Sequence, residues 1–247
     1  MPRHRTPTER LRRALARLHL EGVARGTALG ALRFARWVGG TDRALVRRHF
    51  ESEPARRLHL GCGTHLLDGW LNSDRCPRSG RLLSLDVTRR FPLPDDAFDY
   101  VFSEHVIEHL EYRQGGHMLA ECFRVLKPGG RLRISTPDLA FLIALHGDDL
   151  SDLQEGFIRH SIDTWFNGAP GYDSTFVINN YVRAWGHQFI YDERVLRDSM
   201  ERAGFTHLKR YPVSESEDEE LRNLEHVSRK PPGLIALESC VIEGTKP

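Results

Sequence analysis

The chain has 247 residues, of which 40% are hydrophobic and 28% charged, and its net charge is +1 at pH 7. This length fits one large domain or one domain with an appendage, and the composition is ordinary for a globular protein. No stretch approaches the run of apolar residues that spans a membrane, and arginines interrupt the apolar positions before residue 40. We therefore expect neither a transmembrane segment nor a signal peptide.

The charge is distributed unevenly along the chain. Residues 1–50 hold 12 arginines and three acidic residues, a net charge of +9, whereas the remainder has a net charge of −8. Leucines recur at helical spacing near residues 11–18, and a second apolar cluster follows at residues 29–38. We predict that residues 1–50 form an extension of basic amphipathic helices. The favoured interpretation is that it packs on the following domain; peripheral contact with a membrane surface or a partner is the alternative.

The cysteines show no pairing or metal-binding pattern. Cys62, Cys76, Cys122 and Cys240 form no CxxC pair and no zinc-finger spacing. We expect free thiols and a cytoplasmic location, because disulfides are rare in reducing compartments.

From Arg57 onward, short apolar runs alternate with helical patterns, which is typical of a parallel α/β sheet. Strands are expected at residues 58–60, 70–73, 82–85, 98–102, 131–135, 207–213 and 234–243, and helices at 117–126 and 192–203. Only the nine residues from Gly61 to Gly69 connect the first two strands, although a parallel crossover normally needs about a dozen. The helix of this crossover must be very short or replaced by a compact loop.

Two strand ends indicate a nucleotide-like cofactor site. The first strand ends in Gly61-Cys62-Gly63, and the second ends at Asp74. Glycines allow a ligand to approach the backbone closely, and a strand-end carboxylate can accept hydrogen bonds from a ribose diol. Leu66 stands where the dinucleotide motif GxGxxG has its third glycine, which argues against a dinucleotide.

Later motifs extend this pattern: LDVTRRFPLPDDAFDYVF at residues 85–102, and LKPGGRLRIS at residues 126–135. With these motifs the chain resembles the class I S-adenosylmethionine-dependent methyltransferases, in particular the methyltransferase-11-like branch, from about Arg57 to Gly244. The resemblance implies a Rossmann-like, seven-stranded, mostly parallel sheet with a final antiparallel strand, within a domain of residues 51–247. It also implies S-adenosyl-L-methionine as the cofactor.

The resemblance implies a role for each strand-end residue. The Gly61-Cys62-Gly63 turn would face the methionine part of the cofactor, and Asp74 would hold the ribose hydroxyls. Asp86 would accept a hydrogen bond from the adenine amino group, with the amide of Val87 beside the ring. Ser103, just past the fourth strand, would lie near the cofactor. The alternative is that these carboxylates only cap helices.

The segment from Ser103 to His109 contains the spacing HxxEH. This spacing is typical of a zinc metallohydrolase in which two histidines share one helix face. We regard that function as a less favoured alternative, because the segment follows a strand where the next helix of the sheet is expected. The segment also resembles that of some ubiquinone-pathway O-methyltransferases, which implies a divalent ion at His105, Glu108 and His109. The favoured interpretation is a Glu108–His109 pair that fixes the helix, and no metal ligand is assigned.

Methyl transfer requires alignment of the acceptor and a group that takes its proton. His105 and His187 are the predicted catalytic bases, and a hydrogen-bonded structural histidine is the alternative for each. Residues 139–186 form a predicted substrate-side insert, rich in aromatic and amide side chains. Arg183 in this insert could pair with a carboxylate or phosphate of the acceptor.

The predicted function is methyl transfer to a small-molecule, glycan or natural-product acceptor, at oxygen. The alternative is a cofactor-binding scaffold without turnover, with the basic extension as its interaction surface. No nucleic-acid partner is expected, because the basic segment carries leucine stripes and no known RNA-binding motif.

Overall fold

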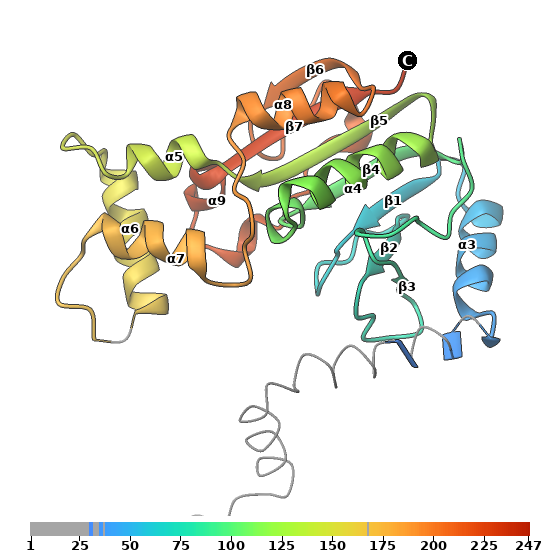
Figure 1. The fold of residues 1–247 in the computed structure, drawn as a ribbon, viewed down its shortest axis with the longest axis horizontal. Helices are drawn as coiled ribbons and strands as arrows, with labels where there is room; N and C mark the ends of the chain where they lie inside the picture. Colours follow the sequence, from blue (N-terminus) through green and yellow to red (C-terminus); the bar gives the residue numbers. More distant parts are fainter. Residues whose placement is uncertain (1–29, 32–34, 37, 167) are drawn as a thin grey trace, which may run out of the picture.

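A seven-stranded sheet organises the computed structural model, which describes residues 30–31, 35–36, 38–166 and 168–247 (Figure 1). The strand order is β3-β2-β1-β4-β5-β7-β6. Strand β7 is antiparallel to both of its neighbours, and the other strand pairs are parallel. The strands are β1 (Arg57–Leu60), β2 (Leu71–Asp74), β3 (Leu83–Ser84), β4 (Phe98–Glu104), β5 (Leu126–Pro137), β6 (Thr206–Tyr211) and β7 (Ser239–Thr245). The fold class predicted from the sequence is confirmed.

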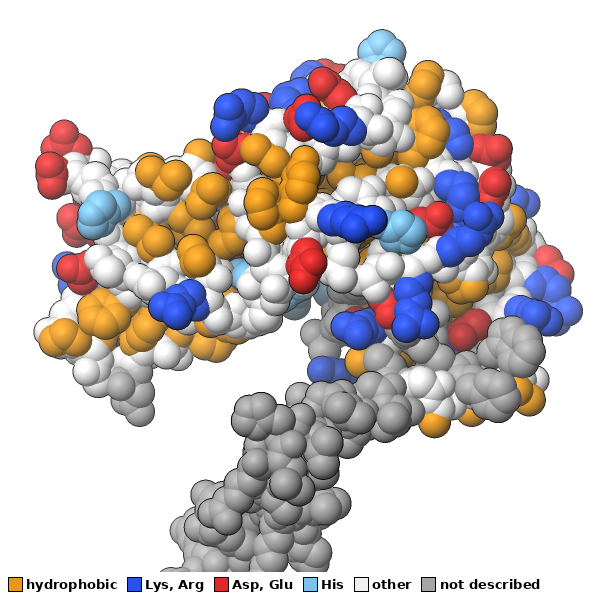
Figure 2. All heavy atoms as spheres, viewed as in Figure 1, with side chains coloured by type: hydrophobic (Ala, Val, Ile, Leu, Met, Phe, Trp, Pro, Cys, Tyr) orange, Lys and Arg blue, Asp and Glu red, His pale blue; other side chains and the backbone are white. Residues whose placement is uncertain are grey.

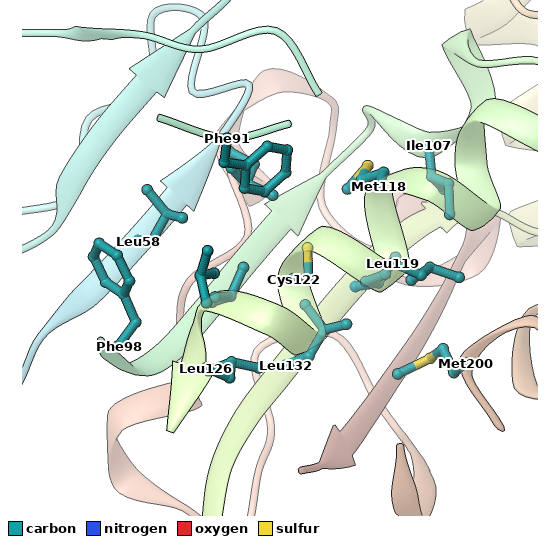
Figure 3. Packing of buried hydrophobic residues seen from close by; sticks show 14 of the residues in the cluster. Leu58, Phe91, Phe98, Ile107, Met118, Leu119, Cys122, Leu126, Leu132 and Met200 are labelled. Atoms are coloured by element: carbon teal, nitrogen blue, oxygen red, sulfur yellow. The ribbon is translucent and has the colours of Figure 1, made fainter. Parts of the chain in front are cut away.

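Two helices, α4 (Tyr112–Val125) and α8 (Glu193–Arg202), cover one face of the sheet (Figure 1). Figure 3 shows the buried side of α4, where Met118, Leu119 and Cys122 gather with Leu132 of β5. The predicted helix at residues 192–203 is confirmed. The helix predicted at residues 117–126 begins earlier, because the Glu111 side chain and Gln114 form a reciprocal capping box at its start.

Helix α3 (Thr41–Ser52) joins the N-terminal segment to the sheet. Leu45, Val46 and Phe50 pack against the core, and Asp42 accepts a hydrogen bond from the backbone N–H of Ser84 at 3.2 Å. The domain boundary predicted between residues 50 and 51 therefore falls inside this helix. The amphipathic helix predicted around residues 11–18 lies outside the described residues.

A compact loop replaces the first crossover helix. Strands β1 and β2 pair directly in parallel, and the described residues 61–70 between them contain no helix. The Asn72 side chain fixes this loop by accepting from the backbone of Leu67 and donating to the carbonyls of Leu67 and Trp70. The face left uncovered is instead packed by the β6–β7 connection, residues 212–238, through contacts such as Leu221 and Leu224 against Phe102. This connection contains η2 (Glu219–Leu221), η3 (Val227–Arg229) and α9 (Leu234–Glu238).

The segment predicted as the substrate-side insert forms α5 (Leu139–Ala144), α6 (Asp152–Trp165) and α7 (Ser174–Arg183), on the left in Figure 1. These helices share a second hydrophobic cluster with Leu234 of α9. Figure 2 shows hydrophobic side chains gathered over this part of the surface. Within the described residues, no helix has the length and apolar character needed to cross a membrane.

Three local predictions are wrong. Strand β4 runs to Glu104, so Ser103 lies within it and not past its end. The expected helix after β4 is only one 3-10 turn, η1 (Ile107–His109), because His105 adopts a positive φ of 50° and Leu110 is extended. Residues 234–238 form helix α9 before β7, since Gly233 at φ 82° turns the chain into a helix. An apolar run of this length does not by itself distinguish helix from strand.

Candidate functional site

The glycine turn that follows β1 and Asp74 at the end of β2 meet at the carboxyl edge of the sheet. Gly61 and Gly63 adopt φ values of 64° and 53°. Asp74 Oδ2 accepts from the Gly63 N–H at 3.1 Å, and Oδ1 accepts from the Cys76 N–H at 2.7 Å. The structure thus brings these predicted site residues together. Cys62 is buried between them, and burial together with the charge of Asp74 raises the pKa of its thiol to about 11, so the thiol stays protonated.

Asp86 follows β3 and is buried. Its Oδ1 accepts from the N–H and the hydroxyl of Thr88 at 3.1 and 2.7 Å, and Oδ2 lies 3.8 Å from Nε of both Arg75 and Arg89. One oxygen is therefore held by its own turn, and no helix follows Asp86 in the described segment between β3 and β4 for it to cap. Val87 is partly buried against the core. An adenine contact by Asp86 and Val87 remains a prediction.

Ser103 lies in β4 beside this edge and is 1% exposed. Its hydroxyl has no hydrogen-bond partner among the described residues. Buried hydroxyls are normally satisfied, so an unsatisfied one next to a glycine turn is consistent with a polar ligand there. Apart from its own chain neighbours, no described residue has a heavy atom within 4 Å of a Cβ built on Gly63, which leaves room at the turn. These features fit a nucleoside-containing cofactor such as S-adenosylmethionine.

A cavity of about 210 Å³ lies at the same edge of the sheet. It is lined by four parts of the chain: the β4–α4 connection, the end of β5, the helical insert with its following loop, and the β6–β7 connection. The lining residues are His105, Glu108, His109, Pro137, Trp165, Tyr181, Trp185, His187, Arg229, Lys230 and Glu238. The two predicted catalytic histidines, far apart in the sequence, therefore line one cavity.

His105 contacts a fully buried carboxylate. Its Nδ1 lies 3.0 Å from Oε1 of Glu108, and its Nε2 is buried without a partner among the described residues. The other oxygen of Glu108 accepts from the Thr136 hydroxyl at 3.2 Å. Burial alone would raise the pKa of Glu108, but His105 and His109 outweigh it, and the pKa lies below its usual value. Glu108 is therefore ionised, and its Oε1 lies close to Nδ1 of His105 without hydrogen-bond geometry.

The tautomer of His187 follows from its hydrogen bond. Nδ1 lies 2.6 Å from the carbonyl oxygen of Tyr181, which can only accept, so Nδ1 carries the proton and Nε2 has a free lone pair. Burial is the main cause that lowers the pKa of His187. The ring is thus neutral at pH 7 and can accept a proton at Nε2.

Glu108, His109 and His187 form a group that could hold a metal ion. One potential ligand atom from each lies within 4.8 Å of the others. This set is not the HxxEH pair, because His105 and His109 are not placed on one helix face. The helix that a metallohydrolase site of this kind needs is absent from the described segment between β4 and α4.

Sequence reasoning missed the charged wall of the cavity. Lys230 Nζ donates to the Tyr181 hydroxyl at 2.8 Å and pairs with Glu238. A guanidinium nitrogen of Arg229 lies 3.7 Å from Glu104 and 3.8 Å from Glu238. The predicted Arg183 does not line the cavity. The sequence signal for this wall is weak: the basic pair Arg229-Lys230 follows the acidic residues 215–220. No local pattern indicates that this pair lies beside the helical insert of residues 139–186.

Comparison with known proteins gives the class of this domain. Residues 71–134 match the family model described as a methyltransferase domain. The malonyl-[acyl-carrier protein] O-methyltransferase of Methylococcus capsulatus is 31% identical over 141 residues, 47% of this chain and 50% of that protein. A probable S-adenosylmethionine-dependent methyltransferase of Mycolicibacterium smegmatis is 49% identical over 47 residues, 19% of this chain and 18% of that protein. The chain thus spans half or less of the length of these curated relatives.

The solved structures that are similar to this chain include a SAM-dependent methyltransferase from Archaeoglobus fulgidus, with 19% sequence identity and a TM-score of 0.48. The alignment covers 87% of this chain and 99% of that one. A 1,6-didemethyltoxoflavin-N1-methyltransferase from Burkholderia thailandensis has 15% identity and a TM-score of 0.47, covering 100% and 92%. Residues 71–134 therefore belong to a methyltransferase domain, and the sheet that contains them is mostly parallel with one antiparallel strand, as predicted for a class I S-adenosylmethionine-dependent methyltransferase. The family and the cofactor predicted from the sequence are confirmed.

Proposed function

We propose that this protein transfers a methyl group from S-adenosylmethionine to a hydroxyl of a small, ring-bearing acceptor such as a glycan or natural product. The observation that carries the proposal is the cavity at the carboxyl edge of the sheet. It combines two histidines that have unpartnered or free Nε2 atoms with the aromatic side chains of Trp165, Tyr181 and Trp185. The cytoplasmic location stays a prediction.

The cofactor supplies a methyl group on a sulfonium, which makes the methyl reactive without a metal. The glycine turn and Ser103 would hold its methionine end, and Asp74 would hold the ribose, which fixes the direction of transfer. The indole rings of Trp165 and Trp185, with centroids 5.2 Å apart, would pack on the acceptor ring and exclude water.

His105 is the favoured proton acceptor. The Glu108 carboxylate lies next to Nδ1 of its ring, which leaves Nε2 to take the proton of the acceptor hydroxyl as the new C–O bond forms. His187 is the second candidate, with its Nε2 freed by the bond to the Tyr181 carbonyl. Transfer to oxygen is supported by the name of the Methylococcus capsulatus relative, a malonyl-[acyl-carrier protein] O-methyltransferase, although a malonyl group offers a carboxylate oxygen and not an alcohol.

A cofactor-binding scaffold without turnover is the second candidate function. The largely exposed arginines of α3, which no part of the proposed reaction uses, favour it. Detection of methyl transfer to any acceptor would eliminate it.

Calorimetry with S-adenosylhomocysteine tests the cofactor site. We expect binding with a Kd well below about 1 mM, and Asp74→Ala should weaken it at least about tenfold. Asp68→Ala is the matched control, because it removes an exposed carboxylate from the same β1–β2 loop. Absence of binding to the unaltered protein would refute the proposed function, and equal affinities of the two variants would move the ribose contact elsewhere.

Turnover with isotope-labelled cofactor tests the bases. On a panel of glycans and phenolic natural products, His105→Ala and His187→Ala should lower kcat about 100-fold or more while cofactor affinity stays the same. The exposed His117 of α4 provides the control variant His117→Ala. Full rates in both histidine variants would show that the reaction uses neither as a base.

A further inference from the structure

A second, larger cavity lies beside β3, the strand at one end of the sheet order. It has a volume of about 880 Å³ and lies between α3, the edge strand β3 and the β3–β4 connection. It shares no lining residue with the acceptor cavity. The lining residues are Arg36, Asp42, Arg43, Val46, Arg47, Phe50, Glu51, Arg56, Leu83, Ser84, Asp86, Arg89, Arg90 and Pro92.

Positive charge dominates this lining, with six arginines against three carboxylates. Two of the arginines have structural roles. The Arg36 guanidinium donates to Asp42 at 2.6 Å and to the carbonyl of Leu82 at 2.5 Å, and that of Arg56 lies 4.3 Å from the centre of the Phe50 ring. These contacts attach α3 to the sheet and build the walls of the cavity.

Three other arginines are on the rim and are weakly held. The side chains of Arg47, Arg89 and Arg90 are 75%, 76% and 72% exposed. Their nearest carboxylate contacts are long, at 3.9, 3.8 and 3.5 Å, and none forms a hydrogen bond with another described residue. Exposed ion pairs of this kind contribute little to the stability of the fold, so these side chains can turn toward a ligand at little cost.

The floor of the cavity contains an unsatisfied polar atom. Ser84 is 8% exposed, and its hydroxyl has no hydrogen-bond partner among the described residues. Val46, Phe50 and Leu83 are the apolar members of the same lining. A buried hydroxyl donor in the same cavity as several guanidinium groups is suited to an anion that accepts hydrogen bonds and carries an apolar part.

We propose that this cavity binds a phosphate-bearing ligand, either a free phosphorylated metabolite or the head group of a phosphorylated lipid. Guanidinium groups donate paired hydrogen bonds that match the oxygens of a phosphate, and several around one cavity can neutralise a dianion. The proposal also accounts for the basic N-terminal segment: its Arg36, Arg43 and Arg47 are placed at a cavity shared with the β3–β4 connection. It does not depend on the proposed reaction.

Calorimetry of the full chain with inorganic pyrophosphate, at low ionic strength and without cofactor, is the first test. We expect a Kd below about 1 mM, weakened about tenfold or more in the double variant Arg89→Ala/Arg90→Ala. Arg194→Ala is the matched control, because Arg194 is 88% exposed and lies 3.9 Å from Asp192 on the distant helix α8. Thermal melts should show that both variants stay folded. No binding, or equal loss in the variant and the control, would overturn the proposal.

Two further arms separate the sources of the phosphate. Binding to phosphatidylcholine vesicles that contain phosphatidic acid, but not to phosphatidylcholine alone, indicates a lipid head group, and pyrophosphate should then compete with the vesicles. Binding of pyrophosphate without vesicle binding indicates a free metabolite. Asp86 lines this cavity and is also a predicted cofactor contact. Loss of pyrophosphate binding in saturating S-adenosylhomocysteine would show that the cavity belongs to the cofactor site, which would refute a separate phosphate site.

Discussion

Gly61 offers a direct test of how the cofactor turn is built. Its φ of 64° is a left-handed conformation, and a Cβ at this position would lie 2.3 Å from Cγ2 of Val106. Gly63 has a similar φ of 53° but, apart from its own chain neighbours, no described heavy atom within 4 Å of its Cβ position. The two glycines thus have similar backbone strain, and steric overlap is the main difference in what an added methyl group would meet.

The expected losses of stability follow from the backbone strain and the steric overlap. A left-handed alanine costs about 1–2 kcal/mol, and forcing a methyl group into a packed site costs about 1–3 kcal/mol more. Gly61→Ala should lower the free energy of unfolding by about 3 kcal/mol and Gly63→Ala by about 1 kcal/mol. Val106→Ala removes the overlapping methyl, so the double variant Gly61→Ala/Val106→Ala should be less destabilised than the two single changes added together.

Urea denaturation followed by circular dichroism measures all four variants, and calorimetry with S-adenosylhomocysteine reports the turn itself. Val106 follows His105, so the displacement caused by Gly61→Ala should also weaken cofactor binding and slow turnover. Equal destabilisation by Gly61→Ala and Gly63→Ala would refute the steric reasoning, as would additive effects in the double variant.

Three further predictions concern stability. Arg133 is fully buried and donates to Glu225 at 2.7 Å and to Glu243 at 2.6 Å. Arg133→Met removes the only cation that the described residues place against the buried Glu225, whereas Glu243 keeps its ion pair with Arg131, so the change should cost about 3–5 kcal/mol in urea denaturation. A cost under about 1 kcal/mol would contradict this. Asp192 caps α8 by accepting from the Val195 N–H at 2.7 Å, so Asp192→Ala should cost about 1 kcal/mol and Asp192→Asn much less; equal costs would show that the cap is not the cause. Burial alone would raise the pKa of Glu121, but hydrogen bonds from Arg124 and the Phe91 N–H lower it below the usual 4.5. The stability that ionised Glu121 contributes to the folded state is therefore complete above pH 4.5, and it is lost as the pH falls through the lower pKa of the folded state. Denaturation midpoints from pH 6 to pH 3 should therefore fall less steeply for Glu121→Gln, and parallel curves would contradict the assignment.

The cofactor edge of the sheet was predictable because it depends on local patterns. Strand ends such as Gly61 and Asp74 are defined by short apolar runs and turn residues, and parallel strands place their carboxyl ends at one edge. The compact β1–β2 loop followed from chain length alone, because the available residues could not form a full crossover. The helix at residues 192–203 followed from its cap and its spacing.

The segment after β4 was mispredicted because its local preference is weak. HVIEHL is compatible with a helix, but the left-handed His105 and the capping box at Glu111 delay the helix to Tyr112. As a result, His105 contacts Glu108 within a turn, and His109 lies against His187 with ring centroids 4.8 Å apart. Helix periodicity could not indicate this arrangement.

The sequence by itself determined the α/β class, the glycine turn with its strand-end carboxylate and the methyltransferase family. Each of these depends on short segments of consecutive residues, whose conformation is set by local interactions. The tertiary structure decided the walls of both cavities. The β6–β7 connection places Arg229 and Lys230 in the same cavity as the two histidines. The arginines of α3 line one cavity with Arg89 and Arg90 because Leu45, Val46 and Phe50 of α3 pack against the core. Such contacts join residues far apart in the chain, and they form because burial of apolar surface brings distant segments together.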